Sequence, residues 1–578
     1  MFISSVELKG FRNFNDAIIK FREQSLIIGA NDVGKSNLIW AIRLLLDRSI
    51  SENDIAPQEA DFHVSNDGKQ SSTLSIQILL KNVYEDAVLS KLKGWVSDDG
   101  SVLVEYNASL DSLEYTLRIG ASRELLEGID GRIYLKYIHF RFIQSYRDLS
   151  QIIRKEKKEL IKRAKSLRED EQITSDKTKE ETISGLITDV NDSVNKLSYI
   201  IDSTNHLNTE LKQLSHHHGN SDLSFMAGSV SLSSFIERLN LRIQRGDKSI
   251  MYGGDGRNNQ IAISIWKTES VLDCDNTNEA YLFCIEEPEA HLHPHQQRKL
   301  AQYVTEKLPG QVIVSTHSPQ ITSEFSPENV IRLYEQAGCT VAASNGCSLT
   351  IEETWKEFGY RMSILPAECF FSDAVILVEG PSELQFYKGL CKAYGIDLDF
   401  YNISILEISG IAFEAYWKIL KALEIPCVIR TDNDVSKVPK KSPQEWQLAG
   451  INRALSLLDK PTKDHILRDN CMPTDDDVQR IRDEVSEQIN PDGIFLSKWD
   501  LEHDLSEILG NEMMQFAKAD TVEKAVAYLQ EKKAIRMTEF LSSDYVELAN
   551  IPKNDPLFTP IQKALELIGH RAQDHGQD

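Results

Sequence analysis

Several features that would place this chain in a specialised class are missing from its sequence. None of the eight cysteines forms a Cys-x-x-Cys pair, so the sequence predicts neither a zinc site nor a disulfide framework. No apolar run approaches the ~18 residues of a membrane span. The opening MFISSVELKGF also lacks the charged-then-apolar form of a signal peptide. We therefore expect a protein of a reducing, cytoplasmic compartment with no membrane segment.

Basic side chains are too few to balance the acidic ones, which leaves a formal net charge of -24. This argues against a general, charge-driven affinity for nucleic acid, which needs clustered Lys and Arg. It does not exclude a metal-dependent enzyme, because bound cations reverse the local field of acidic ligands. The length of 578 residues predicts roughly two to four domains.

A glycine-rich loop, GANDVGKS at residues 29–36, follows a short apolar strand and precedes a helix predicted to end near Asp47. This order is the context of a P-loop, in which backbone N–H groups converge on phosphate oxygens. Lys35 would reach the β- and γ-phosphates, and Ser36 would bind Mg²⁺. The segment thus predicts an ATP site. Its other candidate contacts are Asn31, Gly34 and Asn37.

Two further apolar strands end in residues suited to the same site. YLFCIEEPEAHLHP delivers Glu286, a metal-organising acid, and Glu287, a water-activating base. VIVSTHSP ends in His317, placed to sense the γ-phosphate, although an ordinary strand-end histidine fits this fragment alone. Three fragments in this order together predict ATP binding.

Between these fragments the composition changes. Basic residues crowd the stretch 154–168, and apolar residues then recur in steps of three and four over 183–201. Such spacing predicts long helices that pair with each other or with a second subunit. A solvated helix face is the plainer interpretation of the basic run.

The predicted domains are the first part of an ATPase head over 1–150, a helical insert for dimerisation over 151–250, the second part of the head over 251–347, and a C-terminal α/β domain with a helical tail over 348–578.

Acidic residues gather at strand ends of the C-terminal domain. ILVEGPSE is an apolar strand that delivers Glu379, with Glu383 at the start of a helix. CVIRTDND ends in Asp432 and Asp434, which are separated by one residue and can share a divalent cation. An Asp-x-Asp pair in a surface loop is usually inert, but the strand-end setting favours a site.

A later segment, FLSKWDLEHDL, adds Asp500 and Glu502. Oxygen ligands of this kind suit Mg²⁺ or Mn²⁺ rather than zinc, and two cations favour cleavage of a phosphodiester. Lys532 or Lys533 would neutralise charge in the transition state, although both also fit a solvated helix face.

The first set of motifs, with FRNF at residues 11–14, resembles ABC-type ATPase heads of the structural-maintenance kind, in which an Arg at the Arg12 position lies near the nucleotide. The chain lacks an LSGGQ signature loop, and YGGDGRNNQ at 252–260 is the candidate for its place. The second set resembles the Toprim domain, a Rossmann-like parallel sheet. An ATPase head with a helical insert followed by Toprim is the layout of the OLD family nucleases, and the resemblance covers essentially the full length.

This resemblance implies an α/β fold and a nucleotide-regulated DNA endonuclease of bacterial anti-phage defence, either a nickase or a double-strand cutter. It implies Mg²⁺ or Mn²⁺ and ATP as cofactors, a homodimer or tetramer, and a helicase-like partner subunit. Carried over by position, Glu379 and Asp500 would be metal or base residues, with Asp432 beside them. Lys533 would be the transition-state lysine, preferred over Lys532 by its spacing from Met537.

Two other functions also fit parts of the sequence. An ATP-driven DNA-binding scaffold with an inactive Toprim domain is supported by the net charge of -24 and the missing LSGGQ loop. A topoisomerase-like strand passer would need a tyrosine nucleophile, and tyrosines are plentiful. The sequence does not indicate whether ATP activates or inhibits.

Overall fold

The computed structural model forms two compact units by its internal contacts. One comprises Met1–Gln144, Thr277–Glu306 and Gly310–Asp578, and the other comprises Ser145–Asn276 and Lys307–Pro309. The residues described are 1–144, 149–214, 223, 225, 232–237, 239, 241, 243–245, 248–250, 255–272, 279–358, 364–408, 413–439, 444–464, 466–467 and 474–574.

The N-terminal part of the first unit contains an antiparallel sheet with the strand order β2-β1-β4-β5-β6-β7. In β4 every second residue is buried, as expected for a strand with one face on the core. The strands are β1 (Phe2–Phe11), β2 (Phe14–Lys20), β4 (Thr73–Lys81), β5 (Val102–Ser109), β6 (Tyr115–Gly120) and β7 (Glu127–Ile129).

A second sheet carries the nucleotide motifs, with the order β14-β13-β3-β12-β11-β8. All but the edge strand β14 run parallel, and β11 and β12 are buried along their whole length, which explains their unbroken apolar sequences. The strands are β3 (Gln24–Ile28), β8 (Ile138–Ile143), β11 (Ala280–Glu286), β12 (Gln311–Ser315), β13 (Val330–Gln336) and β14 (Cys339–Ala342). The predicted strand–loop–helix order of the P-loop is confirmed.

Helix α1 (Lys35–Leu46) begins directly after the glycine loop. Its first turn is reached through Gly34, whose φ of 97° lies in the left-handed region that favours glycine. Leu38, Ile42 and Leu45 are fully buried in a core shared by strands of both sheets. The P-loop is therefore fixed at both ends by buried structure.

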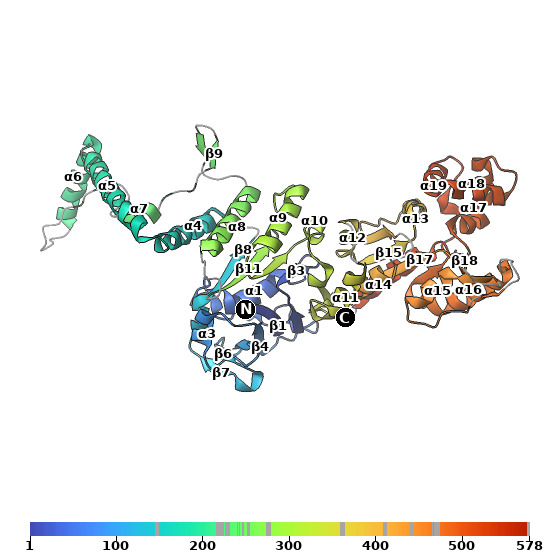
Figure 1. The fold of residues 1–578 in the computed structure, drawn as a ribbon, viewed down its shortest axis with the longest axis horizontal. Coiled ribbons are helices and arrows are strands. Elements are labelled where there is room, and N and C mark those ends of the chain that lie inside the picture. Colours follow the sequence, from blue (N-terminus) through green and yellow to red (C-terminus); the bar gives the residue numbers. More distant parts are fainter. Residues whose placement is uncertain are drawn as a thin grey trace. The chain divides into compact units, whose positions relative to one another are not determined.

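The second unit is largely helical and contains the predicted long helices (Figure 1). They are α4 (Leu149–Ser166), α5 (Asp170–Asn195) and α6 (Ser198–Leu214). The unit also contains the short helix α7 (Leu232–Glu237), a hairpin of β9 (Ile243–Arg245) and β10 (Lys248–Ile250), and α8 (Asp255–Leu272), which lies beyond the predicted insert of 151–250. The apolar seam is exposed within this chain, since Leu186 and Val190 keep 59% and 54% of their accessible surface. Its pairing with a second subunit stays a prediction. The histidines at 216–218 and part of the candidate signature loop lie outside the described residues.

The C-terminal part of the first unit is built on a parallel sheet with the order β16-β15-β17-β21. Its strands are β15 (Ala374–Val378), β16 (Ile403–Glu407), β17 (Cys427–Thr431) and β21 (Ile494–Leu496). The surrounding helices are α11 (Leu349–Phe358), α12 (Ile364–Cys369), α13 (Pro381–Ala393), α14 (Phe413–Ala422), α16 (Asp475–Ile489), α17 (Leu501–Ala517), α18 (Val522–Glu531), α19 (Lys533–Leu541) and α20 (Thr559–Asp574). The predicted fold class, an α/β ATPase head with a helical insert and a C-terminal Rossmann-like sheet, is confirmed.

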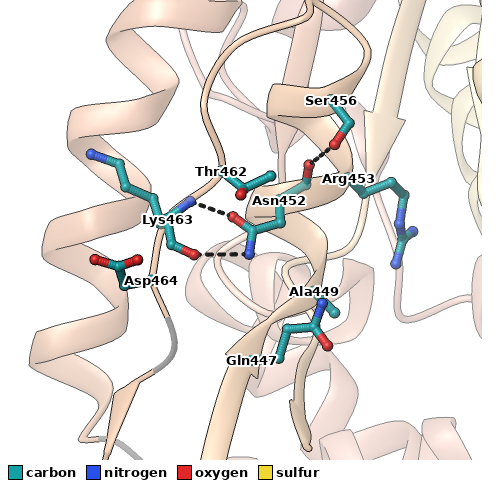
Figure 2. Close-up of a pocket in the computed structure, with 8 residues that line it drawn as sticks. All are labelled: Gln447, Ala449, Asn452, Arg453, Ser456, Thr462, Lys463 and Asp464. Carbon is teal, nitrogen blue, oxygen red and sulfur yellow. Dashed lines mark hydrogen bonds between the residues drawn. The ribbon is translucent and has the colours of Figure 1, made fainter.

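A small three-stranded sheet and the helices α15 and α16 lie in the chain between β17 and β21. The sheet joins β18 (Val435–Lys437), β19 (Glu445–Leu448) and β20 (Ile466–Leu467), and α15 (Ala449–Ser456) follows β19 directly. The side-chain amide of Asn452 on α15 bonds both the backbone N–H and the carbonyl of Lys463, at 2.7 and 3.1 Å (Figure 2). This insertion brings α15 against the end of β17.

Candidate functional sites

The P-loop lies at the carboxyl end of β3, where ligands of parallel α/β sheets bind. The amino group of Lys35 donates to the carbonyls of Gly29 and Ala30, at 3.0 and 2.7 Å. Burial lowers the pKa of Lys35, and nearby carboxylates oppose that shift. The Ser36 hydroxyl donates to Glu286 at the end of β11. The structure thus brings together the predicted lysine, the hydroxyl and one acid.

Arg12 is linked to the same loop from β1. Its guanidinium donates to Asp61 at 2.9 Å and to the side chain of Asn37 at 2.8 Å, while Asn37 also donates to Asn13. Arg12 has a φ of 48°, a left-handed conformation that costs a non-glycine residue free energy. The predicted Arg12 and Asn37 are therefore neighbours at the start of α1, whereas Asn31 is exposed.

The second acid and the histidine also converge. The Glu287 carboxylate lies 3.7 Å from Nε2 of His317, and the Glu287 backbone has a φ of 46°. Burial, followed by the charge of Lys35, lowers the pKa of His317. Burial is also the main cause of a raised pKa at Glu286. Titratable side chains with shifted pKa values that meet at strand ends mark a candidate functional site.

One further residue of this site, Glu289, lies inside the predicted motif but has no predicted role. Its Oε1 accepts hydrogen bonds from the Thr316 hydroxyl at 2.8 Å and from the His317 N–H at 2.6 Å. Burial raises the pKa of Glu289. Glu289 therefore ties the segment after β11 to the backbone of the histidine after β12.

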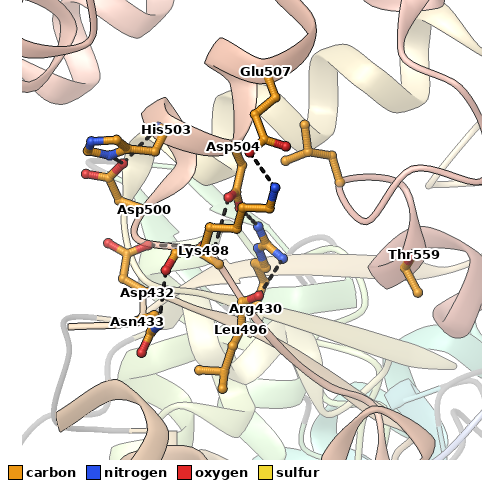
Figure 3. Close-up of polar contacts among 12 residues, drawn as sticks. Arg430, Asp432, Asn433, Leu496, Lys498, Asp500, His503, Asp504, Glu507 and Thr559 are labelled. Carbon is orange, nitrogen blue, oxygen red and sulfur yellow. Dashed lines mark hydrogen bonds and ion pairs between the residues drawn. The ribbon is translucent and has the colours of Figure 1, made fainter. Parts of the chain in front are cut away.

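The second candidate site lies at the carboxyl edge of the C-terminal sheet. Glu379 follows β15, Asp432 and Asp434 follow β17, and Asp500 and Glu502 follow β21 at the start of α17. Because these strands are parallel neighbours, their carboxyl ends share one edge. Figure 3 shows Asp432, Asp500 and the supporting polar contacts.

Glu379 is oriented by three hydrogen bonds to one oxygen. Its Oε2 accepts from the Thr431 hydroxyl at 2.9 Å, the Asp432 N–H at 3.0 Å and Nη1 of Arg453 at 2.8 Å. The other guanidinium nitrogen of Arg453 donates to Oδ2 of Asp434 at 2.7 Å. Arg453 thus holds two predicted metal ligands, while one oxygen of each is outside these bonds.

Three carboxylates of the site are buried and have few hydrogen bonds or ion pairs to offset the cost of losing water. Burial, and then the neighbouring carboxylates, raises the pKa of Asp432 to about 8 and that of Glu383 to about 7. Glu502 is 0% exposed, its pKa is raised chiefly by burial, and neither of its carboxylate oxygens has a hydrogen-bond partner among the described residues. Buried acids without partners are costly unless a proton or a cation is supplied.

Asp500 differs from these three acids because both of its carboxylate oxygens accept hydrogen bonds. It caps the first turn of α17, and its Oδ1 accepts from the backbone N–H of His503 at 3.0 Å and the ring Nδ1 at 2.6 Å. Its Oδ2 accepts from Gln530 at 2.7 Å. Burial alone would raise the pKa of Asp500, but the bonds from His503 and Gln530 hold it below its usual range. Asp500 is thus kept ionised beside acids of raised pKa.

Lys533, the first residue of α19, is the basic group of this cluster. Its amino group lies 3.8 Å from Oδ2 of Asp432. Burial would lower the pKa of Lys533, but the charges of Glu502, Asp432, Asp500 and Glu383 raise it overall. Lys532 is the residue that precedes α19.

The residues present fit divalent cations by the chemistry of their donors, as two buried and unpartnered oxygens of Glu502 indicate. In the conformation described, no three His, Cys, Asp or Glu side chains among the described residues gather into a ready metal site. Glu379 and Asp434 are bonded to Arg453, and Asp500 is bonded to His503 and Gln530.

Below the carboxylates, a buried ion pair fixes α17 to β17. The guanidinium of Arg430 is bonded to Asp504 and donates to the Leu496 carbonyl, and Asp504 accepts the Lys498 N–H at 3.0 Å (Figure 3). The Asn433 amide, between the two aspartates, donates to the Lys498 carbonyl at 3.0 Å. These contacts set the position of the strand ends that carry the acids.

A nucleotide-binding head joined to a parallel-sheet domain with carboxylates at its carboxyl edge defines an ATPase that carries a Toprim domain. Comparison with protein families also finds an ATPase domain and a Toprim domain in this chain. The AAA ATPase domain family matches residues 1–128 and 105–322, and the family described as overcoming lysogenization defect protein-like, TOPRIM domain, matches residues 370–434.

Two relatives match the chain over most of its length. The chain is 26% identical to endonuclease GajA of Bacillus cereus (strain VD045), over 94% of this chain and 95% of that protein. It is 25% identical to the Old nuclease of Escherichia phage P2, over 71% of this chain and 73% of that protein. A solved Smc head domain derived from Pyrococcus furiosus aligns at 15% identity over 62% of this chain and 99% of that one, with a TM-score of 0.38, which is too low to support a conclusion. The chain belongs to the OLD family of nucleases, in which an AAA-type ATPase domain is combined with a Toprim domain.

No helix among the described residues is both long and apolar enough to span a membrane.

Proposed function

We propose that the chain is a DNA endonuclease that depends on Mg²⁺ or Mn²⁺, is regulated by ATP, and acts in bacterial anti-phage defence. The observation that carries the proposal is the buried carboxylate cluster around Lys533, in which Glu502 has two unpartnered oxygens. The names of the relatives, an endonuclease and an OLD nuclease, support the reaction class.

The residues that would hold the cations are Glu379, Glu383, Asp432, Asp434, Asp500 and Glu502. When bound, a pair of such cations would stabilise the attacking and leaving oxygens of the phosphodiester. Lys533, within 3.8 Å of Asp432, would place a positive charge beside the phosphate in the transition state. Arg453 and Thr431 orient Glu379, and His503 and Gln530 orient Asp500.

In the ATPase head, Lys35 and Ser36 would bind the nucleotide phosphates and Mg²⁺, with Glu286 as the organising acid. Glu287 and His317, which lie 3.7 Å apart, would activate a water and sense the γ-phosphate, respectively. The resemblance also suggests a homodimer or tetramer and a helicase-like partner subunit of the GajB kind, and the exposed apolar seam of α5 supports self-association.

Nucleotide control of cutting is supported by Arg332 on β13, the strand beside β3. Arg332 pairs with Ile28, the residue before the P-loop. Its Nη1 donates to the carbonyls of Leu423 and Glu424, each at 3.1 Å. These two residues connect α14 to β17, the strand that ends at the acidic Asp-x-Asp segment. The P-loop strand and the nuclease strand are thus linked through one buried side chain.

The deciding experiment is cleavage of supercoiled DNA with Mg²⁺ or Mn²⁺, with and without ATP. Parent protein should cut, Glu379→Ala and Glu502→Gln should not, and Lys35→Ala should cut without responding to ATP. Arg332→Met should uncouple the two sites, so that ATP binds without changing the cutting rate. Arg48→Met, at an exposed position after α1, is the matched control. Strong ATP turnover with no cleavage under either metal would instead favour the DNA-binding scaffold.

A further inference from the structure

Helix α15 contacts the carboxylate site and also borders a pocket. Gly450 and Arg453 face the Asp432–Asp434 segment and Glu379. Ala449, Asn452, Arg453 and Ser456 of the same helix border a hollow of about 510 Å³, called here the α15 pocket (Figure 2). Besides Ala449 and Arg453, its lining residues are Gln447, Asn452, Ser456, Thr462, Lys463 and Asp464.

The walls of the α15 pocket are fixed by hydrogen bonds. The Asn452 amide bonds the backbone of Lys463 twice, as described above. The Ser456 hydroxyl donates to the Asn452 carbonyl at 2.8 Å, and the Lys463 amino group donates to Glu484 on α16 at 2.8 Å. A pocket whose two walls are joined in this way is formed before a ligand arrives, as is usual for small-ligand sites.

The lining offers hydrogen bonds, because both of its cationic side chains are already paired: Arg453 with Glu379 and Asp434, and Lys463 with Glu484. Gln447 supplies an amide, Thr462 a hydroxyl and Asp464 a carboxylate, while the ammonium of Lys463 is engaged by Glu484. Amides pair with adenine edges, and carboxylates accept from the amino group of cytosine. A phosphate would meet the Asp464 carboxylate and no unengaged lysine. The chemistry therefore fits the polar edge of a nucleobase.

The position of the pocket beside the carboxylate site indicates which nucleotide of the DNA would supply this base. Arg453 lines the pocket and also donates to Glu379 and Asp434, so the pocket and the carboxylate site share one side chain. We propose that the α15 pocket takes the unstacked base of a nucleotide next to the phosphodiester that is cut. This inference rests on the proposed endonuclease function and adds a substrate subsite to it.

A base enters such a pocket only after leaving the duplex stack, which costs a few kcal/mol and costs least where the base is already unpaired. The pocket therefore predicts faster cutting of DNA with unpaired or distorted segments than of relaxed, fully paired duplex. This preference for unpaired DNA should depend on Gln447 and Thr462 of the pocket, and not only on the acids of the carboxylate site.

The test uses a short labelled duplex in which the cut made by the full-length parent protein has been mapped. Single abasic sites are then placed at each nucleotide around the cut, and KM and kcat are measured for the parent, Gln447→Ala and Thr462→Val. Loss of one hydrogen bond of about 0.5–1.5 kcal/mol corresponds to a roughly 3- to 10-fold rise in KM. One abasic position should cause such a rise in the parent and little or none in the two variants. Gln336→Ala, the same change at an exposed position of the head, should behave as the parent.

The outcomes are separable. If the parent cuts but every abasic position affects parent and variants equally, the base subsite is wrong and the nuclease function stands. If the parent cuts no DNA, the function itself is wrong. A free nucleotide offers the same base edge, so the Lys35→Ala variant is titrated with ATP and with deoxynucleoside monophosphates. Saturable binding that Gln447→Ala abolishes, without an abasic effect, would assign the pocket to a free nucleotide and overturn the proposal.

Discussion

Gly450 lies so close to Asp432 that a β-carbon built on it would stand 2.2 Å from the Asp432 carbonyl oxygen. The same β-carbon would meet Cα of Asn433 and the backbone nitrogen of Asp434, each at 2.7 Å. The N–H of Gly450 also donates to the Asp434 carbonyl at 3.1 Å. Because all of these contacts are backbone atoms, a side chain here must displace the acidic segment or the helix.

Gly450→Ala should therefore impair both cutting and stability. Overpacking of this kind costs about 1–3 kcal/mol, and moving Asp432 relative to Glu379 should lower kcat roughly 10-fold or more. Nicking of supercoiled DNA and thermal unfolding measure the two effects. Gly569→Ala is the matched control, because a β-carbon on that α20 glycine meets nothing within 4 Å. Parental activity in Gly450→Ala would show that the close approach is not needed.

Arg453 is expected to set the affinity for cations. Removing it in Arg453→Ala frees the Glu379 and Asp434 oxygens that it holds and leaves their orientation unfixed. Loss of such a supporting group typically weakens metal binding or activity about 10- to 100-fold. Arg453→Lys should recover only part of this loss, because an ammonium lacks the planar fork that reaches both acids.

The measurement for Arg453 is the Mn²⁺ midpoint of cleavage, together with direct Mn²⁺ titration in the absence of DNA. Arg480→Ala, an exposed arginine on α16, controls for the loss of one positive charge. An unchanged Mn²⁺ midpoint in Arg453→Ala would contradict the positioning role, whatever happens to the rate.

The strands of both sites could be predicted from sequence because parallel strands are buried on both faces. The apolar strand predicted before Glu379 is β15 (Ala374–Val378), and the one predicted before Asp432 is β17 (Cys427–Thr431). β15 is apolar throughout, β17 is apolar except for Arg430 and Thr431, and each strand is followed by the acidic residues predicted as metal ligands. Topology then brings these acids to one edge, which follows from the parallel order without any knowledge of side-chain contacts.

The groups that orient the acids could not be predicted in this way. Arg453 lies on a short helix after a polar insertion, and nothing in its spacing from Asp434 indicates a bond. Gln530 reaches Asp500 from α18, thirty positions along the chain. Such partners depend on how helices pack, which no local pattern records. At the other site, Glu289 lies inside the predicted motif YLFCIEEPEAHLHP, but its bonds to Thr316 and His317 depend on the packing of β11 beside β12.

Glu289 should govern nucleotide hydrolysis through His317. In Glu289→Ala the Thr316 hydroxyl and the His317 N–H lose their acceptor, a loss of about 1–3 kcal/mol for buried groups. ATP turnover should fall roughly 10-fold, while ATP binding at the P-loop changes little. Glu289→Gln keeps a carbonyl acceptor and should retain most of the turnover, and Thr316→Val should be intermediate. Equal turnover in Glu289→Ala and parent protein would exclude this link.

Cation binding at the carboxylate site should release protons at neutral pH. Burial and neighbouring carboxylates raise the pKa of Glu383 to about 7 and of Asp432 to about 8, far above the values of about 4 in an unfolded chain. Before a cation binds, the folded protein therefore holds more protons than the unfolded chain between about pH 4 and pH 8. These two groups make the metal-free fold less stable as the pH rises through that window, and a cation must displace their protons.

Titration calorimetry of Mg²⁺ at pH 6, in buffers of different ionisation enthalpy, should count roughly two protons released as the site fills. The apparent affinity should rise with pH from 6 to 8 and level off above 8, where both acids are already ionised. Glu383→Gln should lower the count by about one proton and flatten the rise below pH 7, while leaving the Asp432 component in place. Release that is absent at pH 6, or an affinity that does not change between pH 6 and pH 8, would mean that these acids are ionised before the cation arrives.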